Sequence, residues 1–507
     1  MLNLVVTVDE GPQYKYRHFS WEGMTLFDEE MLQRSLGLES GDQYSDEDFN
    51  LAVFDRVQGL YMDRGYIYSR IEPEITPVGE DSLDIHFIVT ENHKVYINHI
   101  AIKGNTRTKD RVIRREMRFS EGDAFSNEKL KRSEQRIRNL GFFETVESVN
   151  KETKKMDRTD VVLKVAEKPT GQFNVGGGFS STNGALANVG IAEKNFLGKG
   201  QDLRVKFTVA EKTTQFDFGF TEPYFYNKDM ILGFDLFKTK TTYADESSYD
   251  NDTMGTGFRL GYMVTDKTRH VWNYSYKDEE IEGVKAGASE FISNQKGQYS
   301  TSAISHRLTY FGVNDRFSPT KGTTWNFSNQ LAGLGGTISF FKSDVKHDFF
   351  YSVTDNYVLS THIKAGYIFG YNDDKVKLKD RYFLGADSFP GFETAGIGPR
   401  DTTSANKDAL GGNSMYSFKT ELKFPIPGVA PQLGINGALF GIAGAVTDID
   451  ETGGSKIKDD STPRSSVGFG IQWKSPFGPV RLDFAHAIMK EDYDRTQFFK
   501  FNFGASF

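Results

Sequence analysis

The chain has 507 residues, with 61 Lys and Arg against 69 Asp and Glu and no cysteine. Its length exceeds that of one compact domain, and its mixed charge excludes a disordered or nucleic-acid-binding chain. The lack of cysteine excludes disulfides, thiolate zinc sites and cysteine nucleophiles. With 38% hydrophobic residues, the composition also argues against a bundle of membrane helices.

The N-terminal third contains an internal repeat, because residues 11–91 and 92–167 carry the same landmarks. The shared landmarks are Gly23 with Gly104, Gly41-Asp42 with Gly122-Asp123, Tyr44-Ser45 with Phe125-Ser126, and the closing Val89-Thr90-Glu91 with Val165-Ala166-Glu167. A further Val-x-Glu at Val8-Asp9-Glu10 indicates that residues 1–13 are the remnant of a preceding repeat. We therefore expect the chain to be a truncated product of a longer gene.

Each repeat is predicted to fold as a small α+β domain of order βααββ, over residues 14–92 and 94–168. Ser45 and Ser126 each precede acidic residues and are predicted to cap the second helix of their unit. In the first unit, one face of that helix is predicted from helical spacing to consist of Leu51, Phe54, Val57, Leu60 and Tyr61. Such a domain leaves a sheet edge that can accept a strand from another chain, although edges are more often blunted or covered.

The two units differ in charge: residues 1–91 hold 6 basic and 19 acidic residues, whereas residues 92–168 hold 19 and 12. The simpler interpretation is two solvated surfaces. The alternative is that the basic unit faces an anionic membrane surface or an acidic partner.

After Pro169 the helical spacing ends and apolar and polar residues alternate. The alternation is clearest at the C-terminus, where Phe499, Phe501, Phe503, Ala505 and Phe507 share one face. Sixteen alternating segments follow Gly171, and an even number with aromatic residues on the outer face is typical of an outer-membrane barrel. Residues 169–507 are therefore predicted to form a transmembrane barrel of 16 antiparallel strands.

No constellation for chemical catalysis is present in the sequence. The nine histidines lack metal-ligand spacing, and Gly176-Gly177-Gly178-Phe179-Ser180 fits neither a phosphate loop nor a nucleophile elbow. An embedded hydrolase is the weaker hypothesis, and we expect no enzyme activity, no metal and no cofactor.

Two features carry a family resemblance. One is Asp387-Ser388-Phe389-Pro390-Gly391-Phe392, followed by Gly396-Ile397-Gly398-Pro399-Arg400-Asp401, and the other is the terminal strand ending in Phe507. With the repeats in front of them, these features resemble the BamA family of outer-membrane β-barrel assembly factors, and the repeats resemble its POTRA domains. The family signature is an aliphatic residue, Arg, Gly, then Phe or Tyr, so Pro390 stands where the family has arginine.

The resemblance implies two POTRA domains in the periplasm and a barrel in the bacterial outer membrane. It implies a folding and insertion factor whose clients are outer-membrane proteins and whose partners are accessory lipoproteins and outer-membrane lipid, but not nucleic acid. A TamA-like insertase or a POTRA-barrel secretion pore is an alternative, and a passive porin or receptor is an alternative of another class.

The resemblance also implies a lateral seam between the first and last strands, at which we place Gln172, Phe173, Asn174, Phe501, Phe503 and Phe507. The loop motif Phe389, Pro390, Gly391, Phe392 is expected to lie in the lumen. Because Pro390 supplies no cation, Arg400 is expected to anchor the loop. The possible lumen anchors are Asp448, Arg481 and Asp483, and the alternative is that Arg400 is a solvated loop charge.

Overall fold

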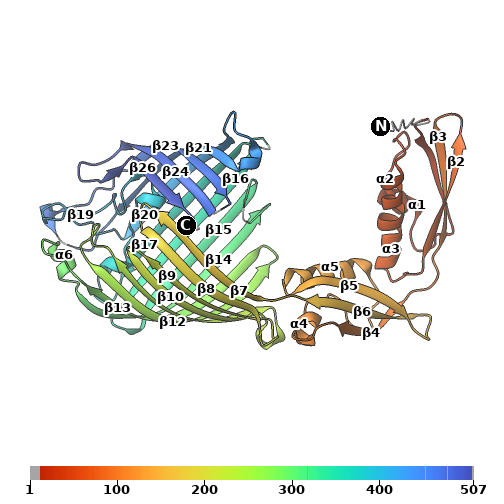
Figure 1. The fold of residues 1–507 in the computed structure, drawn as a ribbon, viewed down its shortest axis with the longest axis horizontal. Coiled ribbons are helices and arrows are strands. Elements are labelled where there is room, and N and C mark those ends of the chain that lie inside the picture. The colour runs from red at the N-terminus through yellow and green to blue at the C-terminus, as the bar shows by residue number, and fades with distance from the viewer. Residues whose placement is uncertain (1–11, 317, 355, 452, 477, 505–507) are drawn as a thin grey trace, which may run out of the picture. The chain divides into compact units, whose positions relative to one another are not determined.

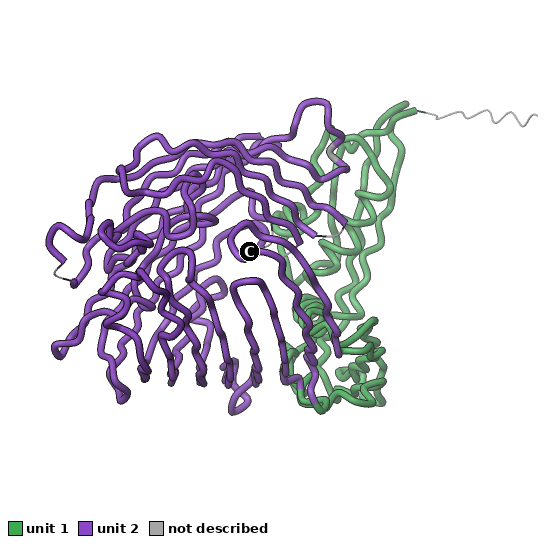
Figure 2. The backbone as a smooth tube through the Cα atoms, turned by 60° about the vertical axis from the view of Figure 1, so that its left-hand side comes forward, with its two compact units in different colours: residues 1–170, 197–199 green, residues 171–196, 200–507 purple. Residues whose placement is uncertain are grey.

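The computed structural model describes residues 12–504 except 317, 355, 452 and 477. It divides into one unit of residues 1–170 with 197–199 and a second of residues 171–196 with 200–507 (Figure 2). The repeat remnant predicted over residues 1–13 lies almost entirely outside the described residues.

The first unit contains two modules, each built on a three-stranded mixed sheet (Figure 1). In both modules the last strand is central, pairing in parallel with the first strand and antiparallel with the second. The first module comprises β1 (Lys15–Glu22), α1 (Glu29–Leu36), α2 (Asp46–Asn50), π-helix η1 (Leu51–Val57), α3 (Gln58–Asp63), β2 (Arg70–Val78) and β3 (Ser82–Thr90). The second comprises β4 (Tyr96–Lys103), α4 (Asp110–Arg114), α5 (Asn127–Asn139), β5 (Phe143–Glu152) and β6 (Arg158–Glu167).

Both predicted helix caps form. The Ser45 hydroxyl accepts a hydrogen bond from the Asp48 N–H at 3.3 Å, and that of Ser126 accepts one from the Lys129 N–H at 3.2 Å. The predicted apolar face of the first module's helix is wrong in part, because Leu51 and Phe54 are 47% and 49% exposed. The chain winds as a π-helix there, and its wider turn shifts side chains away from the 3.6-residue spacing.

The repeat landmarks meet in space at the end of each first strand. Gly23 and Gly104 have φ of +80° and +94°, and a Cβ on either would collide with the carbonyl oxygen of Val89 or Val165. Two residues after Val89, the Glu91 carboxylate accepts hydrogen bonds from the N–H groups of Thr25 and Leu26 at 2.7 and 2.8 Å. The glycine and the Val-x-Glu motif therefore specify one structure, a loop that crosses closely over the central strand.

Glu167 makes the same contact in the second module. Its carboxylate accepts the N–H groups of Thr106, Arg107 and Thr108 at 2.6 to 3.0 Å. Burial by itself would raise the pKa of Glu167, but hydrogen bonds from Thr108, Arg107 and Thr106 outweigh burial and lower the pKa to about 2.

Glu167→Gln should therefore destabilise the second module at neutral pH, by about 1–2 kcal/mol, because three N–H groups lose a charged acceptor. The stabilisation from a carboxylate with a lowered folded-state pKa is present above its unfolded pKa and is lost as pH falls through the folded value. The wild-type urea midpoint, read from hydrogen exchange of this module's peptides, should fall between about pH 4.5 and pH 2. That part of the decline should be smaller in Glu167→Gln and unchanged in Glu147→Gln, which alters an exposed carboxylate of the same module. Equal pH profiles for wild type and Glu167→Gln would contradict this role.

The second unit is a closed antiparallel barrel of sixteen strands among the described residues (Figure 1). This confirms the predicted barrel, and each of the sixteen alternating segments corresponds to one strand. The strands are β7 (Gly171–Ser180), β8 (Gly184–Phe196), β9 (Gln201–Ala210), β10 (Thr213–Glu222), β11 (Met230–Thr242), β12 (Asp250–Thr265), β13 (Thr268–Glu282), β14 (Gly297–Val313), β15 (Gly322–Gly336), β16 (Phe340–Ser352), β17 (Val358–Gly370), β20 (Ser414–Pro425), β21 (Ile435–Thr447), β23 (Arg464–Ser475), β24 (Gly478–Met489) and β26 (Phe499–Phe503).

The longest connections of the barrel lie on one rim. The long connections include residues 243–249, 283–296, 371–413 and 448–463. Short helical turns and strands in the connections of the two rims are η2 (Phe225–Asn227), α6 (Glu290–Ser293), η3 (Leu378–Asp380), η4 (Ala386–Ser388), β18 (Gly391–Phe392), β19 (Arg400–Asp401), η5 (Pro431–Leu433), η6 (Gly454–Lys456), β22 (Ile457–Lys458) and β25 (Thr496–Gln497). No helix in the described part of the chain is long and apolar enough to cross a membrane.

The barrel presents apolar side chains outward and polar ones inward. On β26, Phe499 is 45% exposed, whereas Lys500 and Asn502, with the opposite orientation, are each 5% exposed. The outer surface also carries exposed Phe207, Phe258, Trp272, Trp325 and Phe418. Since no second sheet in the described part of the chain covers this face, it suits lipid.

Nitroxide labels on Phe207→Cys and Phe499→Cys should collide frequently with oxygen dissolved in the bilayer, because both side chains point outward. A label on Lys206→Cys, one residue away and facing the lumen, should instead respond to a water-soluble relaxing agent. The absence of native cysteine makes each label unique. Equal oxygen accessibility at positions 206 and 207 would contradict the assigned faces.

Candidate functional site

The barrel closes between its last and first strands through a very short ladder. Among the described residues, β26 pairs with β7 at two positions, Asn502 with Ser180 and Phe503 with Phe179. On its other side β7 pairs with β8 over ten positions, from Gly171 with Glu193 to Ser180 with Gly184. The seam is therefore the shortest ladder of the described barrel, and the next shortest, between β24 and β26, joins five positions.

A few further contacts support this seam just beyond β7. The Ser181 N–H donates to the Phe501 carbonyl oxygen at 3.0 Å, and the Phe501 N–H donates to the Ser181 hydroxyl at 3.0 Å. The rings of Phe179 and Phe501 stack with centroids 6.0 Å apart. All of these contacts lie at the end of β7 that leads into the turn at residues 181–183.

The structure therefore places only some of the predicted seam residues at the seam. Phe501 and Phe503 lie at the observed seam, whereas the described partners of Gln172, Phe173 and Asn174 belong to β8 alone. Phe173 is 69% exposed. Phe507 lies outside the described residues.

The predicted last strand over 497–507 is interrupted at its start. β25, just before β26, pairs with β18 of the long loop, joining Gly391 with Gln497 and Phe392 with Thr496. The ladder of β26 with β24 begins at Phe499. The end of the chain therefore pairs first with the long loop, through β25, and then with the barrel wall, through β26.

The long loop, residues 371–413, packs against the inner wall. Phe389 and Phe392 are buried, and their rings pack edge to face with centroids 5.4 Å apart. They share an apolar cluster with wall residues Ala303, Ala332 and Ile442. Because Ile304 and Leu331, next to the first two, are exposed outward, this cluster lies in the lumen.

Backbone shape rather than charge fits the Pro390-Gly391 turn to the wall. Gly391 has φ +101°, and a Cβ there would lie 2.8 Å from the Ser466 Cβ on β23. The Ser466 hydroxyl donates to the Pro390 carbonyl oxygen, which needs no cation from residue 390. Sequence analysis missed Ser466, because nothing local distinguishes it from Ser465.

Arg400 is buried, with 2% exposure, but does not reach the carboxylates that the sequence analysis expected. Its guanidinium donates to the carbonyl oxygens of Lys407 and Ala395, each at 2.7 Å. Arg400 therefore braces the loop internally, which differs both from wall anchoring and from a solvated charge. Asp448, one expected anchor, follows β21, and its N–H donates to the Asp459 carboxylate at 3.0 Å.

The wall carries its own cation. Arg481 on β24 donates to Asp483 at 2.8 Å and to Glu421 on β20 at 2.8 Å. Lys419 and Gln472 also contact Glu421, at 2.8 and 3.1 Å. The Arg481 guanidinium therefore neutralises the lumen carboxylates where Pro390 cannot. Sequence analysis named Arg481 and Asp483 as possible lumen anchors and missed Glu421, which lies 60 residues before Arg481.

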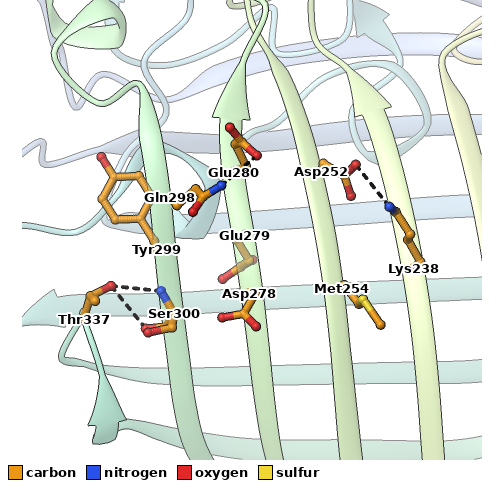
Figure 3. Close-up of a pocket in the computed structure, with 10 residues that line it drawn as sticks. All are labelled: Lys238, Asp252, Met254, Asp278, Glu279, Glu280, Gln298, Tyr299, Ser300 and Thr337. Atoms are coloured by element: carbon orange, nitrogen blue, oxygen red, sulfur yellow. Dashed lines mark hydrogen bonds and ion pairs between the residues drawn. The ribbon is translucent and has the colours of Figure 1, made fainter.

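A separate hollow of about 520 Å³ lies across β11 to β14 (Figure 3). Its lining is mostly polar, with Lys238 against Asp252 at 3.7 Å and Gln298 against Glu280 at 3.3 Å. None of the predicted site residues lines it. Within the described ranges, no cluster of His, Asp and Glu could hold a metal ion.

Comparison with known families agrees with this architecture. The Omp85 superfamily domain matches residues 195–507, and the surface antigen variable number repeat, or POTRA, matches residues 14–92 and 95–168. The chain belongs to the Omp85 superfamily. This assignment confirms the resemblance inferred from the repeats and the loop motif.

Individual relatives are similar over most of the chain. The outer membrane protein assembly factor BamA of Neorickettsia risticii (strain Illinois) is 34% identical over 448 residues, 88% of this chain and 60% of that protein. The BamA of Nitratidesulfovibrio vulgaris (strain ATCC 29579 / DSM 644 / CCUG 34227 / NCIMB 8303 / VKM B-1760 / Hildenborough) is 27% identical over 510 residues, 99% of this chain and 63% of that protein. The chain thus spans less than two thirds of either relative.

A solved structure shares the fold. The crystal structure of BamA from Haemophilus ducreyi lacking POTRA domains 1-3 aligns with a TM-score of 0.84 at 24% identity. The alignment covers 98% of this chain and 100% of that chain.

Gly391→Val should loosen the loop, because its side chain meets Ser466 and its backbone has a positive φ, a strain of about 1–3 kcal/mol. Arg400→Ala should also loosen it, because the buried Ala395 carbonyl oxygen loses the Arg400 donor and the Lys407 carbonyl oxygen keeps only the donor from Arg495. Both variants should lose the compact, fast-migrating gel band at lower temperature than wild type, whereas Pro390→Ala should match wild type. A damaging Pro390→Ala with a harmless Gly391→Val would contradict this account of the turn.

Proposed function

We propose that this chain folds and inserts outer-membrane proteins, using the seam between β7 and β26 as a site where a client strand pairs. The observation that supports the proposal is the two-position ladder at a junction surrounded by much longer ones. The similarity to proteins named outer membrane protein assembly factor supports the same activity.

The physical argument concerns unpaired backbone groups. A strand in lipid must satisfy every N–H and C=O through another strand, because hydrocarbon offers no hydrogen-bond partner. Among the described residues, the edge of β7 from Gly171 to Gly176 pairs with no strand on the side that faces β26, and Gly504 lies against Gly177 and Gly178. Such an edge is a template on which an incoming strand can form its first hydrogen bonds.

The POTRA-like modules supply further strand edges. In the first module β2 is an edge strand, and its two prolines, Pro73 and Pro77, remove donors and blunt that edge. In the second module the edge strand β5 contains no proline. We assign to β5 the task of receiving an extended client segment in the periplasm.

The chain would therefore lie in the bacterial outer membrane, with its modules in the periplasm and with lipid around the barrel. Its partners would be client barrel proteins and the accessory lipoproteins of an assembly complex. Insertion uses hydrogen-bond exchange alone, so the proposal includes no chemical step, metal or cofactor.

A passive pore is the competing function of a different class. The lumen cluster of Phe389, Phe392, Ile397 and their wall partners fills space that a porin would leave open. A TamA-like insertase or a secretion pore shares the architecture and differs in its cargo. Single-channel recordings would separate the classes, since an insertase with this loop in place should show no steady large conductance.

A disulfide across the seam should abolish client insertion. Phe179 and Phe503 face each other in the ladder, so cysteines at these two positions are close enough to bond. Liposomes with the oxidised protein should insert a client barrel no better than empty liposomes, and a reducing agent should restore insertion.

The matched control is a cysteine pair at Val467 and His486, which face each other on β23 and β24 away from the seam. Oxidation of this pair should leave insertion unchanged. Equal insertion by the oxidised and reduced seam pair would rule out opening at this junction.

A further inference from the structure

One loop carboxylate contacts both sides of the seam. Asp387 lies in the short turn η4, two residues before Phe389. Its Oδ1 accepts hydrogen bonds from Lys500 Nζ and, at 2.8 Å, from Asn502 Nδ2, both on β26. Its Oδ2 accepts one from the Thr182 hydroxyl, which follows β7, at 3.3 Å.

The two partners on β26 face the lumen and are nearly excluded from solvent. Lys500 and Asn502 are each 5% exposed, whereas the Asp387 side chain retains 42% exposure. A buried ammonium group needs a carboxylate nearby, because its loss of hydration is otherwise uncompensated. Asp483 faces Lys500 in the β24 to β26 ladder but forms its ion pair with Arg481. Asp387 therefore supplies the carboxylate that pairs with Lys500.

Main-chain bonds extend the contact along the chain. The Glu393 N–H donates to the Arg495 carbonyl oxygen, and the Arg495 N–H donates to the Gly396 carbonyl oxygen, both at 3.0 Å. With the β18 to β25 ladder, loop residues 387–396 follow the last strand from position 495 to position 502. The loop and the last strand are therefore joined along most of this segment.

We propose that Asp387, Lys500, Asn502 and Thr182 form a latch, the Asp387 latch, that holds the seam closed from the lumen side. The two-position backbone ladder is supplemented by three hydrogen bonds to a single carboxylate, one from the charged Lys500 and two from the uncharged donors Asn502 and Thr182. Release of Asp387 removes the counter-charge of Lys500 and the connection to Thr182 together. Movement of the loop is thereby coupled to opening of the seam, and Asp387 is a positioning residue for the last strand.

This inference rests on the proposed function only for what seam opening achieves, since the latch itself can be measured without a client. The readout is the rate of disulfide formation under mild oxidation between cysteines replacing Phe179 and Phe503 in protein-containing liposomes. Cysteines in a closed seam react readily, whereas an open seam separates them. The rate therefore reports the closed population.

Asp387→Asn and Lys500→Gln should each lower that rate, by about tenfold if the full charge-assisted bond contributes. Because both substitutions break the same bond, the double variant should be no slower than the slower single variant. Asp373→Asn, an exposed carboxylate in the same long loop, should keep the parent rate.

The cysteine pair at Val467 and His486 checks folding, and its rate should not change in any variant. An unchanged seam rate in both Asp387→Asn and Lys500→Gln would overturn the latch, and so would effects that multiply in the double variant. Failure of client insertion with a normal latch response would count against the proposed function and leave the latch standing.

Discussion

Backbone groups of a strand in hydrocarbon must be hydrogen-bonded to another strand, and this requirement governs the second unit of this protein. At fifteen of the sixteen strand junctions in the described barrel, neighbours in the sheet are also neighbours in the chain order of the barrel strands. The remaining junction joins β26 to β7, which lie at opposite ends of the barrel sequence. No hairpin enforces their pairing, and their ladder covers two positions among the described residues. The constraint that closes the barrel is thus met by the fewest described strand pairs at this one junction.

The long loop contacts the last strand at the same junction. Its apolar side chains fill the lumen next to the wall, and its β18 strand pairs with β25 just before the chain enters the last barrel strand. Charged side chains of the wall, the loop and the last strand have polar partners in this region. Arg481 on the wall balances Glu421 and Asp483, Arg400 braces the loop from within, and Asp387 meets the buried Lys500 of the last strand.

Much of the fold could be predicted from the sequence, because local patterns specify it. Two-residue alternation located all sixteen strands, and Ser45 and Ser126 marked their helices by a local hydrogen bond. The π-helix at Leu51–Val57 could not be predicted, since its extra residue per turn has no spacing signal. The site was predicted less well. Asp387 and Lys500 are 113 residues apart, and Arg481 and Glu421 are 60 apart, so only tertiary structure shows that they are partners.

The most direct test of the central claim is amide hydrogen exchange of the barrel in lipid nanodiscs, compared strand by strand. Peptides from β7, residues 171–178, should exchange faster than those from β12 and β13, which are paired on both sides. Exchange in β26 should accelerate with that in β7, because both strands border the same opening. Protection of residues 171–178 equal to that of β12 and β13 would show that the seam is no weaker than the rest of the wall and would contradict the account.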